Sequence, residues 1–276
     1  MRINQNVAAF NAYRNLSATG GQLSKSLEKL SSGFRINRAA DDAAGLVKSE
    51  SLRAEVAGTR QSIQNAQDGV SFVQTAEGAL NEVHSILQRM RDLAVSASNT
   101  ATTDGAAQEQ EINELVKELD AIGARTTFAG KQVFKDYSAA TLVFHIGSGS
   151  GTNNQLNITN DLAISSTTSS GLFTVALSSV DVTGSAESAI SLLDSAIADI
   201  STARSKLGAT QNRLEHTIAN LNVAAENLQA SESRIRDADM ALEMVGFTRH
   251  QIMSQAGVAM LAQANAVPQS VLSLLG

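Results

Sequence analysis

Apolar residues recur at alternating steps of three and four at both ends of the chain, the spacing of a single stripe along a helix. The N-terminal stripe consists of Tyr13, Leu16, Gly20, Leu23, Leu27, Leu30 and Phe34. The C-terminal stripe consists of Met253, Gly257, Met260, Ala264, Val267, Val271 and Leu274. Chain ends are usually polar and frayed. These two ends are apolar instead, so each needs a partner that buries its stripe. Both the opposite end of the chain and neighbouring copies are candidates.

The longest regular pattern covers residues 190–228, where only Arg204 and Gln211 interrupt the apolar positions. It predicts one helix of roughly 60 Å, with Ser185 as its N-cap and the two polar positions fixing its register. Residues 50–99 predict a second long helix. Because that helix is apolar on two sides, we expect it to pack against more than one partner.

The middle of the chain has a different composition. A shorter helix is predicted around residues 112–122, ending before Phe128. Residues 138–185 are rich in Ser, Thr, Gly and Asn and poor in charge. Strand-like segments occur there at residues 142–146, 155–159 and 173–177, with a glycine-rich loop at 147–151. The pattern predicts a mainly α fold, in which long antiparallel helices and a terminal coiled coil form a rod with a small β-hairpin region in the middle.

Composition excludes several classes of protein. The 21 basic and 27 acidic residues are interspersed and give a net charge of −6, which argues against a nucleic-acid surface. Without cysteine there is no disulfide, thiol catalysis or Cys-ligated metal. The N-terminus has no apolar signal region, and no run is long enough to span a membrane. If the protein leaves the cell, we expect export without a cleaved signal peptide.

No catalytic, metal or cofactor site is predicted, and we expect no cofactor and no enzyme activity. None of the four histidines has a second histidine three or four residues away. The pair Asp41 and Asp42 is interpreted as the cap of a helix that opens at Ala43 rather than as a metal site. Arg89 and Arg91 place charge on an apolar helix, as either a solvated edge or a recognition surface.

Several segments together resemble bacterial flagellin. They are residues 2–6 (RINQN), 30–37 (LSSGFRIN), 41–46 (DDAAGL), 207–213 (LGATQNR), 233–240 (SRIRDADM), 255–257 (QAG), 262–265 (AQAN) and 272–275 (LSLL). The resemblance covers the chain apart from residues 138–185. Each segment alone is moderately specific, whereas all of them in this order are strongly so.

The resemblance implies a subunit that self-polymerises into the extracellular filament of the bacterial flagellum for swimming motility. It implies an inner filament-core domain of residues 1–45 and 230–276, a rod-like helical domain of residues 46–137 and 186–229, and a short β-rich surface excursion of residues 138–185. The residues expected to mediate self-assembly are Leu16, Leu23, Leu27, Leu30, Phe34, Arg35, Ile235, Leu242, Met253, Met260, Val267, Val271 and Leu274.

The resemblance also implies partners. Besides other copies of the chain, these are a flagellar export chaperone, a filament cap, the hook-junction proteins and a vertebrate Toll-like receptor. The positions that match the receptor-recognition patch are Gln88, Arg89, Leu93 and Glu111.

Three alternatives stand beside flagellin: the nearest is a hook–filament junction protein, and the other two come from other classes of protein. A hook–filament junction protein shares the N-terminal pattern but usually lacks the segment that matches residues 233–240. A non-flagellar coiled-coil adhesin explains the heptads but not the glycine-bearing motifs at Gly33 and Gly208. An enzyme built on a flagellin scaffold would need a metalloprotease insert, and this chain has neither the insert length nor the motif.

Overall fold

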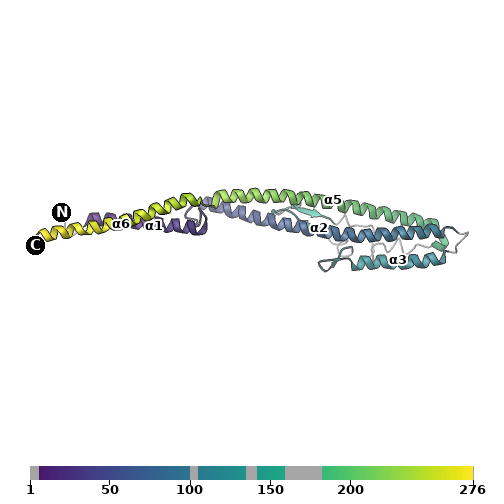
Figure 1. Cartoon of the computed structure of the whole chain (residues 1–276). Coiled ribbons are helices and arrows are strands. Elements are labelled where there is room, and N and C mark those ends of the chain that lie inside the picture. The colour runs from purple at the N-terminus through teal and green to yellow at the C-terminus, as the bar shows by residue number, and fades with distance from the viewer. Residues whose placement is uncertain (1–5, 100–104, 135–141, 159–181, 276) are drawn as a thin grey trace. The chain divides into compact units, whose positions relative to one another are not determined.

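The computed structural model describes residues 6–99, 105–134, 142–158 and 182–275, and its long helices confirm the predicted mainly α fold (Figure 1). The elements are α1 (Val7–Ser32), α2 (Ala43–Ala97), α3 (Ala106–Arg125), β1 (Thr127–Phe128), β2 (Lys131–Gln132), β3 (Val143–His145), the 3-10 helix η1 (Thr152–Asn154), β4 (Gln155–Asn157), α5 (Val182–Arg236) and α6 (Met240–Leu275). The described helices include none with the length and apolarity needed to cross a bilayer.

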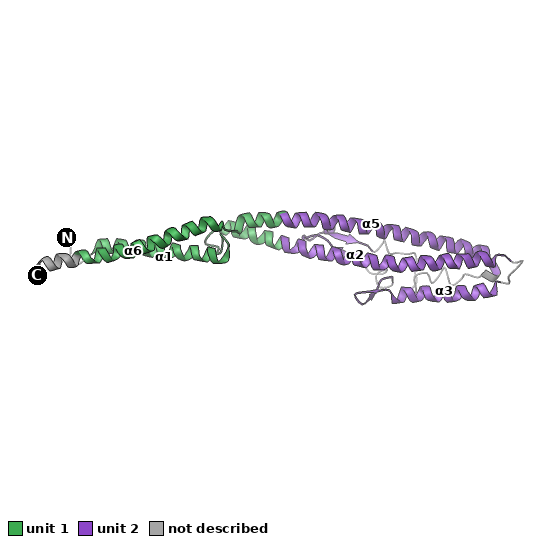
Figure 2. Cartoon of the chain, in the orientation of Figure 1, with its two compact units in different colours: residues 1–54, 227–276 green, residues 55–226 purple. Residues whose placement is uncertain are grey.

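The chain divides into two compact units, which Figure 2 colours separately. Unit 1 comprises residues 1–54 and 227–276, and unit 2 comprises residues 55–226. Helices α2 and α5 each contribute residues to both units. Each unit therefore contains segments from both halves of the sequence.

Unit 2 has one continuous hydrophobic core, to which α2, α3 and α5 all contribute. The apolar positions of the long heptad pattern lie in this core, as the spacing predicts: Leu193, Ile200, Leu207 and Leu214 are buried. Ion pairs join Arg91 to Asp194 and Glu77 to Arg204. Because the residue number falls along α2 as it rises along α5, the two helices are antiparallel in this unit.

Two short hairpins pack beside these helices. β1 pairs with β2 through a turn in which Ala129 and Gly130 have positive φ of 50° and 80°. These two-residue strands are too short to show an alternating pattern, and the sequence did not predict them. β3 pairs with β4, with Phe144 opposite Leu156, which confirms the hairpin expected around the glycine-rich loop. The strand expected at 173–177 lies outside the described residues.

Local capping explains where the helices begin. The Asp42 carboxylate accepts the backbone N–H of Gly45 at 2.9 Å, which confirms the predicted cap of α2. Ser185 has non-helical φ and ψ of −159° and 60°, so the regular part of α5 begins beyond it. α3 starts differently, from Gly105 with φ of 75° and no side-chain cap.

Candidate self-assembly surface

The two chain ends pair with each other as α1 and α6, which lie side by side in unit 1 (Figure 1). At one end of the pair, the Asn6 side chain accepts the Ala9 backbone N–H at 3.0 Å as the N-cap of α1. The same side chain donates to the carbonyl of Ala264 at 2.8 Å. Further along, a Cβ added to Gly257 would lie 3.2 Å from the Leu16 side chain, so the backbones approach closely there.

The covered face of α6 mixes small and large residues, whereas most of its large apolar residues are exposed. The partly covered positions include the small residues Gly246, Ser254, Gly257 and Ala264 and the large residues Phe247 and Leu261. The exposed positions include Leu242, which is 73% exposed. They are Met240, Leu242, Met244, Val245, Ile252, Met253, Val258, Met260 and Val267. The predicted C-terminal stripe is therefore split, because Gly257 and Ala264 face α1 while Met253, Met260 and Val267 face outward.

The N-terminal stripe divides in a similar way. Leu16, Leu23, Leu30 and Phe34 are half-buried, and so is Ile235 at the end of α5. Leu27 and Arg35 are exposed. Val271 and Leu274 lie in the last turns of α6, beyond the residues whose side chains the structure describes.

Other exposed apolar residues were absent from the predicted set. On α1 they include Val7 and Phe10, and on α6 they include Val245, Ile252 and Val258. A single-stripe interpretation excludes residues on the other faces of a helix. The signal that could have found them is that the C-terminal segment is apolar on nearly all sides, a pattern typical of helices that become buried on every face.

Beyond the helix pair, the chain ends are joined where α1 leads into α2 and α5 leads into α6. Phe34 and Asp237 form an isolated antiparallel bridge. The N–H of Arg35 donates to the carbonyl of Arg236 at 2.7 Å, and the N–H of Ala238 donates to the carbonyl of Gly33 at 2.9 Å. The Arg236 guanidinium lies over the Phe34 ring, 4.7 Å from its centroid. Residues some 200 positions apart thus meet through their backbones.

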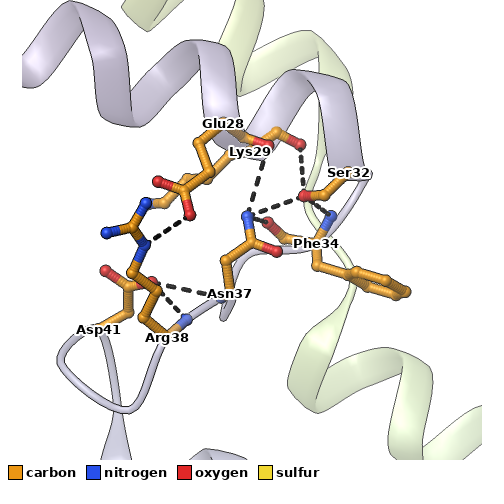
Figure 3. Close-up of polar contacts among 7 residues, drawn as sticks. All are labelled: Glu28, Lys29, Ser32, Phe34, Asn37, Arg38 and Asp41. Carbon is orange, nitrogen blue, oxygen red and sulfur yellow. Dashed lines mark hydrogen bonds and ion pairs between the residues drawn. The ribbon is translucent and has the colours of Figure 1, made fainter.

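A polar cluster shapes the loop between α1 and α2 (Figure 3). The carboxylate of Asp41 accepts the backbone N–H groups of Arg38 at 3.1 Å and Asn37 at 3.2 Å. These hydrogen bonds, chiefly the one from Arg38, lower the pKa of Asp41 from its ordinary value. The Arg38 guanidinium donates to Glu28 at 2.8 Å, and Asn37 donates to the Ser32 hydroxyl at 2.8 Å. The loop is therefore tied back to the last turns of α1.

An ion pair joins α2 to α5 within unit 1. Arg236 donates to the Glu50 carboxylate at 2.7 Å, and Arg53 lies 3.2 Å from the same oxygen. The hydrogen bond from Arg236 is the main reason that the pKa of Glu50 is lowered. Arg236 thus contacts both a carboxylate and an aromatic ring.

The structure brings together two of the four positions of the predicted recognition patch. Arg89 donates from Nε at 2.9 Å and from Nη2 at 2.7 Å to one oxygen of Glu111, which connects α2 to α3. Gln88 is exposed and lies 3.0 Å from the His84 ring nitrogen. Leu93 is only 7% exposed and belongs to the core of unit 2, so it is not part of the exposed surface that carries Gln88 and Arg89.

Two family models match the chain on either side of residues 140–189. The bacterial flagellin N-terminal helical region matches residues 3–139, and the bacterial flagellin C-terminal helical region matches residues 190–275. Three relatives match over the full length of both chains. They are a flagellin of Halalkalibacterium halodurans at 51% identity, a flagellin of Bacillus subtilis at 46%, and the flagellar filament 33 kDa core protein of Treponema phagedenis at 43%.

The paired terminal helices and the antiparallel helices of unit 2 define a mainly α-helical protein. The family matches define it as a structural subunit of a filament. The chain belongs to the bacterial flagellin family. It is a structural subunit of the bacterial flagellar filament, the extracellular fibre of swimming motility, and nothing in the comparisons favours a junction protein or an adhesin.

Proposed function

We propose that the outward apolar faces of α1 and α6 are the surface through which one subunit contacts its neighbours in the filament. The observation that carries the proposal is the distribution of buried apolar residues. Unit 2 has a continuous core, whereas Ile36 is the only buried hydrophobic residue in the described part of unit 1. Burying a large apolar side chain gives ~1.5–3 kcal/mol. The terminal helices therefore gain most from contacts with other copies.

The exposed hydrophobic residues support the same surface. Among the described residues, large exposed hydrophobics outside α1 and α6 are confined to Val47, Val95, Val143 and Val223. All the others lie on the terminal helices. Contiguous apolar surface of this kind is typical of protein–protein contact.

A matched pair of valine variants tests the surface. Val245→Lys places a charge on the outward face of α6, and Val143→Lys makes the same change on β3; both valines are exposed. Monomers prepared by heating are cooled with filament seeds, and the polymerised fraction is measured by sedimentation. We expect Val245→Lys to abolish polymerisation and Val143→Lys to preserve it. Filaments formed equally well by both variants would rule out this face.

The same reasoning couples the folding of the ends to polymerisation. Free subunits should have protease-sensitive termini and a protected unit 2, and filaments should protect both. Brief trypsin treatment of monomers should cut after Arg35 or Arg38 and near Arg234 or Arg236, leaving a soluble fragment that cannot polymerise. Ends that resist trypsin as well in the monomer as in the filament would refute the coupling.

The proposed layers of the filament follow the domain boundaries expected from the sequence. Residues 1–45 and 230–276 form the inner layer, residues 46–137 and 186–229 form the rod around it, and residues 138–185 form the outer surface. A tag inserted after Ser169, which lies outside the described residues, should leave filaments intact and bind antibody along them. Loss of filaments with a normally folded monomer would contradict this order.

A second proposed role is recognition of the free subunit by a vertebrate Toll-like receptor through Gln88, Arg89 and Glu111, with Leu93 underneath. The specific observation is the ion pair that holds Arg89 in place on an exposed surface. Arg89→Ala should weaken receptor activation without changing the far-ultraviolet circular dichroism spectrum, and an unchanged activation curve would exclude Arg89. We also propose that the subunit is exported without a cleaved signal peptide, by way of an export chaperone. In the filament it contacts the cap and the hook-junction proteins.

A further inference from the structure

Methionine is concentrated on the helix that carries the proposed contact surface. Of the six methionines in the chain, four lie in α6. Met244, Met253 and Met260 are 50%, 41% and 64% exposed. Met90 is 0% exposed, in the core of unit 2, and so provides an internal comparison.

The thioethers of the exposed methionines are open to small molecules. Met244 and Met253 line a hollow on α6 together with Val245, Arg249 and Ile252. Methionine is flexible and polarizable, which suits a surface that must pack against another protein. The same sulfur is readily oxidised to a sulfoxide, which changes a flexible apolar side chain into a polar one.

We infer that Met244, Met253 and Met260 form an oxidation site that prevents a free subunit from entering the filament, with a peroxide as the oxidant. The inference rests on the proposed role of the outward face of α6 in subunit contacts. A sulfur lone pair attacks one peroxide oxygen, and the S–O bond forms as the O–O bond breaks. With hydrogen peroxide the second oxygen takes up the proton of the oxygen that has joined the sulfur and leaves as water. The sulfur loses two electrons, and the peroxide gains them.

The composition of the chain makes this reaction selective. The chain contains no cysteine and no tryptophan, so the thioethers are its most readily oxidised side chains. Once neighbouring copies cover α6, the three sulfurs are shielded, and oxidation is restricted to subunits that have not yet assembled. Because methionine sulfoxide reductases reverse the product, the block is reversible.

The effect on assembly comes from burying a polar group at an apolar contact. A sulfoxide oxygen that loses water without gaining a hydrogen-bond donor weakens the contact. The critical concentration for polymerisation should rise about tenfold for each ~1.4 kcal/mol lost per subunit. Three oxidised side chains should therefore stop seeded growth at concentrations that are ample for the untreated subunit.

The test treats full-length monomer with hydrogen peroxide, maps each methionine by peptide mass spectrometry and measures seeded polymerisation by sedimentation. We expect sulfoxide at Met244, Met253 and Met260, and also at Met240, which is 46% exposed and is retained in the variant below. We expect none at Met90, an unchanged circular dichroism spectrum and loss of polymerisation. A variant with all three methionines replaced by leucine should polymerise before and after peroxide. The matched control Met90→Leu should remain as sensitive as the natural chain.

The outcomes separate this inference from the proposed contact surface. If Val245→Lys polymerises normally, the contact surface itself is wrong. If Val245→Lys is blocked but the triple leucine variant still loses polymerisation after peroxide, the oxidation site is wrong. If the triple leucine variant does not polymerise even without peroxide, a second experiment replaces it. The natural chain is oxidised and then repaired with methionine sulfoxide reductase. Recovery of growth as the sulfoxides disappear supports the site, and repaired chains that stay inactive overturn it.

Discussion

The side chain of Phe72 connects helix α2 to both hairpins of unit 2, so its removal is a sharp test of how that unit is held together. Phe72 is 1% exposed, and its ring centroid lies 5.5 Å from that of Phe128 at an angle of 86° and 5.9 Å from that of Phe144. Truncating a buried phenylalanine to alanine costs ~3–5 kcal/mol. In a unit of this size each kcal/mol lowers Tm by ~2–4 °C, so Phe72→Ala should lower Tm by roughly 6–20 °C.

Thermal unfolding of the monomer, followed by far-ultraviolet circular dichroism, measures this change. The control is Ser71→Ala, one residue away, where an exposed hydroxyl bonds the carbonyl of Gln67 at 3.1 Å. Exposed substitutions of this kind usually change stability by less than ~0.5 kcal/mol. Phe72→Leu, which keeps much of the apolar area, should fall between the two. If Phe72→Ala melts within ~2 °C of Ser71→Ala, the aromatic cluster does not stabilise unit 2 and the reasoning is wrong.

Three predictions concern unit 1 and are measured on assembled filaments. Thermal melting measures the first two, and acid titration measures the third. Asn6→Ala removes both the N-cap of α1 and its hydrogen bond to α6, and should cost ~1 kcal/mol or more. Gly33→Ala should cost ~1–2 kcal/mol because φ is 75° there, a conformation that residues with a Cβ rarely adopt. The lowered pKa of Glu50 means that its pairing with Arg236 stabilises above about pH 4.5 and is lost as pH falls through the folded-state pKa. Glu50→Gln should therefore remove part of the acid sensitivity, and a titration curve that does not change would contradict this.

Helices, caps and the hairpin were predictable because their signals are local. A repeat of apolar residues at steps of three and four defines a helix whichever partner covers it. Asp42 caps α2 by bonding to a backbone group three residues away, and the strands of the β3–β4 hairpin are separated by a short glycine-rich loop. The strands β1 and β2 were missed because two residues carry no period.

Which side of each terminal helix faces the other was decided only by tertiary structure. The segment 240–275 is apolar on nearly all sides, so its sequence does not fix one contact stripe. The contact face depends on how closely the two backbones approach. The close approach of Gly257 to Leu16 places the stripe that contains Gly257 and Ala264 inward and leaves most of the large apolar residues exposed. The backbone bonds of Arg35 with Arg236, and the ion pair of Arg89 with Glu111, likewise depend on chain segments that only the fold brings together. Sequence determined the elements because their causes lie within a few residues, while the face of each terminal helix that stays exposed depends on contacts between the two ends of the chain.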